Sequence, residues 1–154
     1  MDKISTHTRY KIAGICFCLA YLALMLFGLR YIFAQSFIPY HETALGTKWD
    51  NMPESFHMLY LALMKVAGGG MLSTGIAGEI LICIPFRKFE PWARWSLLVI
   101  GLIVGGMALT AAITIKLNTP ASPPWILTLC SIILILAGFF LSSGMKKFNL
   151  PVVE

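Results

Sequence analysis

The stretch LALMKVAGGGMLSTGIAGEI, residues 61–80, is apolar enough to lie in a lipid bilayer, yet it contains one lysine, one glutamate and five glycines. It belongs to a longer apolar segment, residues 58–84. As a straight helix this segment would measure about 40 Å, whereas the hydrocarbon core of a bilayer is about 30 Å thick. We therefore expect a membrane-spanning helix that tilts or protrudes, in which the charges and glycines mark either a working site or tolerated irregularities.

The composition of the whole chain is that of a membrane protein. Of its 154 residues, 58% are hydrophobic and only 12% are charged, and the mean hydropathy is +0.78. Soluble domains contain about 45 to 50% apolar residues. The net charge of +5 comes from basic residues scattered at the edges of apolar runs, not clustered with aromatic residues. We therefore expect a lipid bilayer as the surroundings and no binding of nucleic acid.

Four segments have the length of about 20 apolar residues that a membrane-spanning helix needs. They are residues 12–33, 58–84, 92–115 and 125–142. Prolines separate the last three segments, and proline cannot continue a helix because it lacks the N–H group. The sequence thus predicts an all-α fold, a transmembrane four-helix bundle that forms one integral membrane domain over residues 1–154. A longer loop joins its first two helices.

The positions of lysine and arginine predict the orientation of the bundle. Most of them lie in the amino-terminal tail, in the connection between the second and third spans, and after the fourth span. Arg30, Lys48 and Lys116 lie toward the opposite face. The positive-inside rule then predicts a multi-pass protein of the cell membrane with both termini in the cytoplasm and the first loop outside. The first apolar run is longer than a typical signal-peptide core, so we expect it to be retained as a span.

Glycines in the second and third predicted spans indicate close helix packing. In lipid, helices associate through small residues that let their backbones approach, because no hydrophobic drive brings them together. Gly101 and Gly105 have the spacing G-x-x-x-G, which Ala108 and Ala112 extend. We expect the two spans to face each other, with the following glycines at helix contacts: Gly68, Gly69, Gly75, Gly101 and Gly105.

The two charges of the second span lie about 21 Å apart along a helix, too far to pair with each other. Lys65 lies near the external end, where its side chain can reach the interface, and Glu79 lies near the basic internal end. The first loop, QSFIPYHETALGTKWDNMPESFH, is acidic and aromatic. We expect it to fold over the bundle as a lid, with its carboxylates toward Arg30 and Lys65.

This arrangement predicts an external pocket between the first and second spans. We expect five residues to bind a ligand there: Arg30, His41, Glu42, Trp49 and Lys65. Basic, acidic and aromatic groups around an apolar opening suit an amphipathic ligand such as a quinone or a lipid. The alternative interpretation is an ordinary interfacial loop whose surface charges are screened by solvent.

The sequence contains few of the residue patterns that bind metals or haem or that carry out thiol chemistry, and we expect no cofactor. The sequence has no C-x-x-C pair, and no histidine lies within a predicted span, where ligands for haem between facing helices would be needed. We expect the cysteines to be packing residues. Two metal sites stay open as alternatives, an external one of His41, Glu42 and His57, and a soft-metal one of Cys16, Cys18 and Cys83.

Four stretches carry a resemblance to known proteins: FIPYHETALGTKWD (37–50), LALMKVAGGGMLSTGIA (61–77), IPFRKFEPWARW (84–95) and NTPASPPW (118–125). Together they resemble a group of small bacterial four-span membrane proteins without an assigned function. The helix layout is more distantly similar to that of DoxX-like membrane proteins. The resemblance implies a location in the bacterial inner membrane and an accessory role beside an oxidoreductase or in quinone-coupled chemistry. It carries no catalytic motif.

We therefore expect an accessory or ligand-binding membrane subunit and not an enzyme. Its ligand would be a small quinone- or lipid-like amphiphile, and it would act with a membrane protein partner or as a homo-oligomer. Two alternatives stay open. One is a membrane redox component or enzyme that uses a quinone or a metal. The other is an oligomeric transporter of small solutes, since four spans are few for a transporter of one chain.

Overall fold

A computed structural model describes residues 6–143 of the chain, and every regular element in that range is helical. The elements in order are α1 (Thr6–Ile32), α2 (Pro39–Leu45), the 3-10 turn η1 (Trp49–Asn51), α3 (Glu54–Leu81), the π-helical segment η2 (Ile82–Phe86), α4 (Pro91–Asn118) and α5 (Trp125–Leu141). The predicted all-α fold is confirmed. Prolines open α2 and α4, as the missing N–H group of proline favours.

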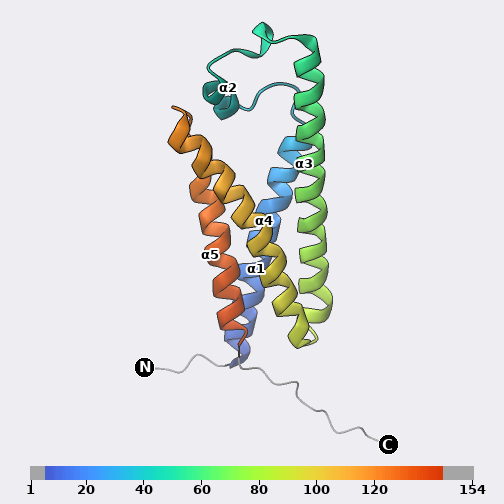
Figure 1. Ribbon diagram of the computed structural model, residues 1–154. Coiled ribbons are helices and arrows are strands. Elements are labelled where there is room, and N and C mark those ends of the chain that lie inside the picture. Colours follow the sequence, from blue (N-terminus) through green and yellow to red (C-terminus); the bar gives the residue numbers. More distant parts are fainter. Residues whose placement is uncertain (1–5, 144–154) are drawn as a thin grey trace, which may run out of the picture.

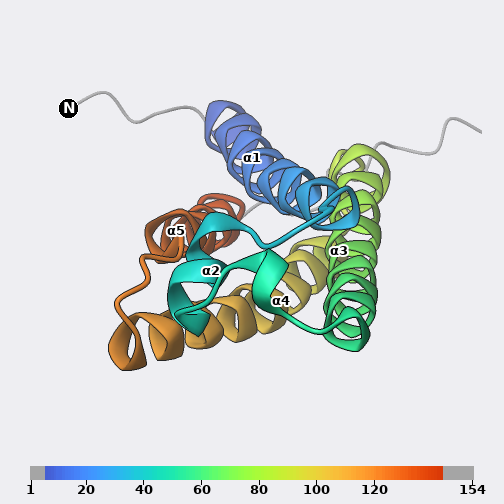
Figure 2. The ribbon, with the colours of Figure 1, turned by 90° about the horizontal axis from the view of Figure 1, so that it is seen from above.

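The four long helices run side by side, and α2 lies across one end of them (Figure 1). We call this the capped end, and the opposite end, where α1 begins and α5 finishes, the terminal end. Seen from above, α2 covers the space that the four helices surround (Figure 2). The predicted lid over the bundle therefore exists, as a short helix of 7 residues.

Three helical segments are long and apolar enough to cross a membrane: His7–Ile32, Glu54–Phe86 and Pro91–Asn118. The fourth predicted span corresponds to α5, an apolar helix of 17 residues. Its length of about 25 Å is less than the thickness of a typical hydrocarbon core, about 30 Å. The chain thus has the helices of a multi-pass integral membrane protein, with three long spans and one shorter apolar helix.

The main buried cluster lies where α1 meets α4, α5 and η2. Phe17, Tyr21 and Leu97 are its largest fully buried side chains. The hydroxyl of Tyr21 donates a hydrogen bond of 2.6 Å to the carbonyl oxygen of Leu97, which ties α1 to α4. In an apolar interior this bond satisfies the only polar atom of the tyrosine side chain.

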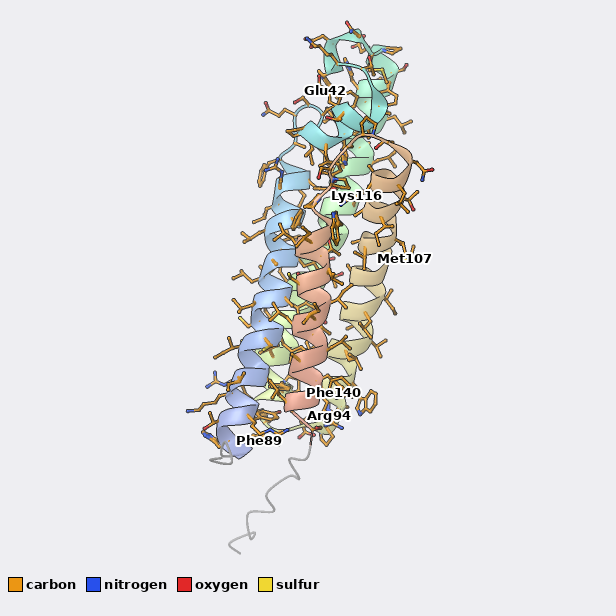
Figure 3. The ribbon with its side chains drawn as sticks, turned by 90° about the vertical axis from the view of Figure 1, so that its left-hand side faces the viewer. Glu42, Phe89, Arg94, Met107, Lys116 and Phe140 are labelled. Carbon is orange, nitrogen blue, oxygen red and sulfur yellow. The ribbon has the colours of Figure 1, made fainter. Side chains whose placement is uncertain are left out.

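Aromatic and cationic contacts close the terminal end. The ring of Tyr10 stacks on the ring of Phe86 at a centroid distance of 4.3 Å. The hydroxyl of Tyr10 also donates a hydrogen bond to the backbone carbonyl oxygen of Phe86. The guanidinium of Arg94 lies 5.1 Å from the ring centre of Phe139 and donates to the carbonyl oxygen of Ser142. Figure 3 shows Arg94 at this end and Glu42 at the capped end.

A close contact between backbones joins α1 to α3 through two glycines. A methyl group added to Gly68 would lie 2.7 Å from the carbonyl oxygen of Gly28, and one added to Gly28 would lie 2.8 Å from the carbonyl oxygen of Gly68. Farther along α3, added methyl groups would clash with Met25 at Gly75 and with the ring of Tyr21 at Gly78. The small face of α3 therefore packs against α1.

The small face of α4 packs elsewhere, so the expectation that the second and third spans face each other through their glycines is wrong. Methyl groups added to Gly101 and Gly105 would meet Ile135 and Ile132, both on α5. Between α3 and α4 there is little contact, because α4 leans away from α3 toward the capped end (Figure 1).

Gly69 also differs from the prediction. No atom lies within 4 Å of a methyl group added there, so the structure does not place Gly69 at a helix contact. Successive residues of a helix point about 100° apart, and of the three adjacent glycines only Gly68 points at α1.

We expect Gly68→Ala to destabilise the protein by about 1 to 3 kcal/mol, because its methyl group would press on the backbone of α1. Gly70→Ala is the matched control, since a methyl group added at Gly70 would meet no other part of the protein within 4 Å. That variant should gain about 0.5 to 1 kcal/mol, the helix preference of alanine over glycine. Thermal unfolding of both variants in one detergent measures the difference, and a Gly68→Ala variant as stable as the parent would contradict the contact.

Candidate functional site

A cavity of about 320 Å³ lies inside the bundle, in the half next to the capped end. Residues of α1, α4 and α5 form its walls, and Tyr40 and His41 of α2 close it on the capped side. Met71 is its single lining residue from α3. The volume is within the range of about 300 to 1,000 Å³ that small-molecule sites occupy in proteins.

Small side chains on α4 explain why the cavity exists. This helix contributes Gly101, Gly105, Ala108, Ala111 and Ala112 to the lining. The facing wall of α1 is also partly small, with Ala20 and Ala23. Because α4 leans away from α3, no large side chain of α3 fills the space that these residues leave. The small residues of α4, whose spacing suggested helix packing, therefore both contact α5 and form a wall of the cavity.

The capped side of the cavity is polar but uncharged. Tyr31 of α1 and Tyr40 of α2 share a hydrogen bond of 2.6 Å between their hydroxyl oxygens. Nδ1 of His41 lies 2.6 Å from the hydroxyl oxygen of Tyr60 on α3. The rings around His41 are those of Tyr31, Tyr40 and Tyr60, and none of these neighbours carries a charge at neutral pH. We call Tyr31, Tyr40, His41 and Tyr60 the roof.

Burial affects the ionisation of both roof residues that belong to α2. It lowers the pKa of His41, so the imidazole is neutral at pH 7, and it raises the pKa of Tyr40, so the phenol keeps its proton. The roof therefore presents neutral hydroxyl and imidazole groups, which can both donate and accept hydrogen bonds.

An aromatic cluster holds the rest of the loop on α3. Phe37 lies edge-on to Trp49 and Tyr60, each at a centroid distance of 4.9 Å. The ring of Trp49 stacks on His57 at 4.0 Å, and Nε2 of His57 donates a hydrogen bond of 2.8 Å to the carbonyl oxygen of Trp49. These contacts give Trp49 and His57 a role in positioning the loop.

A second hollow, of about 510 Å³, adjoins the cavity at the capped end. The two share Phe27, Tyr31, Tyr40, Pro124 and Leu127 as lining residues. The polar groups of this second hollow come from three parts of the chain, the end of α1, helix α2 and the connection before α5, and they include Arg30, Thr43 and Ser122. We call it the Arg30 hollow.

The predicted ligand-binding residues separate into two groups. His41 lines the cavity and Arg30 lines the adjoining hollow, whereas Glu42, Trp49 and Lys65 line neither. Lys65 is exposed on α3, and among residues 6–143 no carboxylate pairs with it or with Arg30. The carboxylates of the lid are therefore not directed at these two cations as expected.

The position of the cavity also differs from the prediction. A pocket between the first and second spans has no room, because α1 and α3 touch through Gly28 and Gly68. The cavity lies on the other side of α1, toward α4 and α5. Tyr31 and Tyr40 were not identified from the sequence as residues that line the cavity. The several tyrosines in and next to the first loop could have indicated them.

The alternative metal sites are not assembled in the described part of the chain. Within residues 6–143, no group of three or more His, Cys, Asp or Glu side chains could hold a metal ion. The four cysteines are free thiols. Glu79, near the terminal end, has one buried carboxyl oxygen, Oε1, without a hydrogen-bond partner, and Cys18 is close to its carboxyl group.

The neutral state of His41 predicts a pH dependence of stability. In the unfolded chain histidine has a pKa of about 6.5, and in the folded protein the pKa of His41 is lower. The stability that the neutral imidazole contributes is therefore complete above about pH 6.5 and decreases as the pH falls from there through the folded pKa. We expect the melting temperature to decrease in this window, and to decrease less in His41→Gln.

Tryptophan fluorescence during heating, at a series of pH values between about 8 and 5, measures this effect. His7→Gln is a control, because His7 is exposed at the terminal end. Its pH profile should match that of the parent. If His41→Gln lost stability in parallel with the parent, the acid sensitivity would come from another group.

Comparisons with known proteins add no relative to this description. No family model matches the chain, and no curated protein or solved structure shows significant similarity to it. The likeness of the helix layout to DoxX-like proteins therefore has no support from them. The function has to be inferred from the geometry of the cavity, its roof and the Arg30 hollow.

Proposed function

We propose that this protein binds a lipid-like amphiphile in the cavity beneath α2, as a binding or accessory subunit of a membrane and without a reaction of its own. The observation that carries the proposal is the cavity itself, apolar along its walls and polar at one end. Small-molecule sites typically combine such apolar walls with a few well-placed polar groups. A quinone or a single-chain lipid has the matching distribution of polar and apolar parts.

The shape of the site supports an orientation for the ligand. Hydrogen-bonding groups gather at the capped side, where Tyr31, Tyr40 and His41 line the cavity. Toward the centre of the bundle the lining becomes apolar, with Leu24, Ala108 and similar residues. The polar end of the ligand would therefore lie at the roof and its apolar part between α1, α4 and α5.

The proposal includes α5 as a fourth span. It runs antiparallel to α4 and contacts α1 (Figures 1 and 2). Trp125 at its capped end has the amphipathic ring that is common at membrane interfaces. A helix of about 25 Å can span a bilayer that thins locally, at a modest energetic cost. Both termini are then on the same side of the membrane.

The basic residues support the direction of insertion. Arg87 and Lys88 are exposed at the terminal end, in the turn between η2 and α4. By the positive-inside rule this end lies in the cytoplasm, and the capped end with its cavity faces the outside. A ligand would therefore reach the roof from the outer leaflet.

Filling the cavity tests the proposed function. Ala108 lines the cavity, and Ala108→Phe should occupy the space of the ligand. Ala77→Phe is the matched control, because Ala77 is exposed on α3 and lines neither the cavity nor the Arg30 hollow. The probe is 5-doxylstearic acid, and the immobilised fraction of its spin label in lipid nanodiscs measures binding.

We expect the parent and Ala77→Phe to bind the probe equally, and Ala108→Phe to bind it at least about tenfold more weakly, since its binding volume is gone. The melting temperature of Ala108→Phe should not be lower than that of the parent by more than a few degrees. Equal binding by all three proteins would contradict the proposed function.

A further inference from the structure

The Arg30 hollow has a feature that the cavity lacks, an unpartnered cation. Arg30 lies in the last turn of α1 and is the one charged residue among those that line the hollow or the cavity. Within residues 6–143 its guanidinium forms no hydrogen bond or ion pair. A guanidinium has five N–H donors in a planar fork, which suits a carboxylate or a phosphate group.

The roof residues, unlike Arg30, already have hydrogen-bond partners within the protein. The hydroxyls of Tyr31 and Tyr40 are bonded to each other, and His41 is bonded to Tyr60. These groups have part of their hydrogen-bonding capacity left, but their first partners are already present. A ligand with an anionic head group would therefore gain most at Arg30, an exposed cation at the capped end that has no counter-charge among residues 6–143.

The hollow and the cavity are arranged so that one molecule can occupy both. Phe27 of α1 and Leu127 of α5 line both spaces, as do Tyr31 and Tyr40. The hydroxyl-bearing residues Thr43 and Ser122 lie around the same hollow as Arg30. A head group at Arg30 would thus have further hydrogen-bonding groups around it, and a chain attached to it would pass Phe27 and Leu127 into the cavity.

The geometry points to an anionic single-chain amphiphile as the ligand, with its carboxylate or phosphate head group at Arg30 and its chain in the cavity between α1, α4 and α5. This assignment rests on the proposed function and adds the charge and the position of the head group. A volume of about 320 Å³ is near the lower limit for ligand sites, which favours one chain over two. No acidic residue lines either space to oppose an anion.

The test compares two probes that differ only in head-group charge, 5-doxylstearic acid and its methyl ester, in nanodiscs of a zwitterionic lipid. Binding is measured above the pKa of the fatty acid in the bilayer, so that the acid is an anion. The variants are Arg30→Gln, Arg30→Lys and Lys48→Gln. Lys48 is the matched control, because it is an exposed cation at the same end that lines neither space.

We expect the parent to bind the acid about tenfold more tightly than the ester, since only the acid can form a charge-assisted pair with a guanidinium. In Arg30→Gln this preference should disappear while binding of the ester is unchanged. Arg30→Lys should restore part of the preference, and Lys48→Gln should keep all of it. Inorganic phosphate in excess should not displace the acid, because the chain holds it.

Four results would overturn the assignment. Equal binding of acid and ester by the parent would remove the charge preference, and an undiminished preference in Arg30→Gln would place it elsewhere. In both cases the cavity would still bind an amphiphile, so the proposed function would stand. Displacement by inorganic phosphate would indicate a simple anion site. If neither probe bound to the parent, the proposed function would fail together with the assignment.

Discussion

The contact between Gly28 and Gly68 determines much of the rest of the structure. In a bilayer there is no hydrophobic gain from bringing two helices together, so close backbone packing takes a large part in selecting helix pairs. A Cβ atom added at either glycine would lie only 2.7 to 2.8 Å from the carbonyl oxygen of the other, so α1 and α3 leave no room for a side chain at this contact. This contact closes the side of α1 on which an outer pocket was expected.

The same contact leaves α4 as the loosely held helix. It is joined to α3 by a short turn at the terminal end and packs along α5 toward the capped end. The side chains of α1 and α4 do not fill the space between the two helices, because most of the α4 residues that face it are glycines and alanines. The bond between Tyr21 and Leu97 links the two helices at the terminal side of the cavity. The cavity is therefore a consequence of which helices are close and which are not.

The sequence predicted the positions of the helices well, because hydropathy and prolines report directly on length and boundaries. It did not predict which helices are partners. Gly68 and Gly101 belong to similar small-residue patterns, and a pattern contains no information on the neighbour that it meets. Nor could three adjacent glycines reveal that Gly68 touches α1 and Gly69 does not.

The candidate site was predicted less well, for a physical reason. Charges suggested a pocket around Arg30, Glu42 and Lys65, whereas the lid is attached by neutral pairs, Tyr31 with Tyr40 and His41 with Tyr60. A cavity is a volume that side chains leave unfilled, and this depends on the directions of the helices as much as on their residues. Arg30 lines a hollow, but its neighbours there come from α2 and from the connection before α5 and not from α3.

We propose that the space between α1, α4 and α5 is the binding site of an amphiphile that comes from the membrane. An experimental structure of the protein in nanodiscs of natural lipids, without added ligand, tests this binding site directly. We expect an elongated density along Ala108 and Leu24 that ends beside Arg30. A structure in which α4 has closed against α3, so that side chains fill this space, would contradict it.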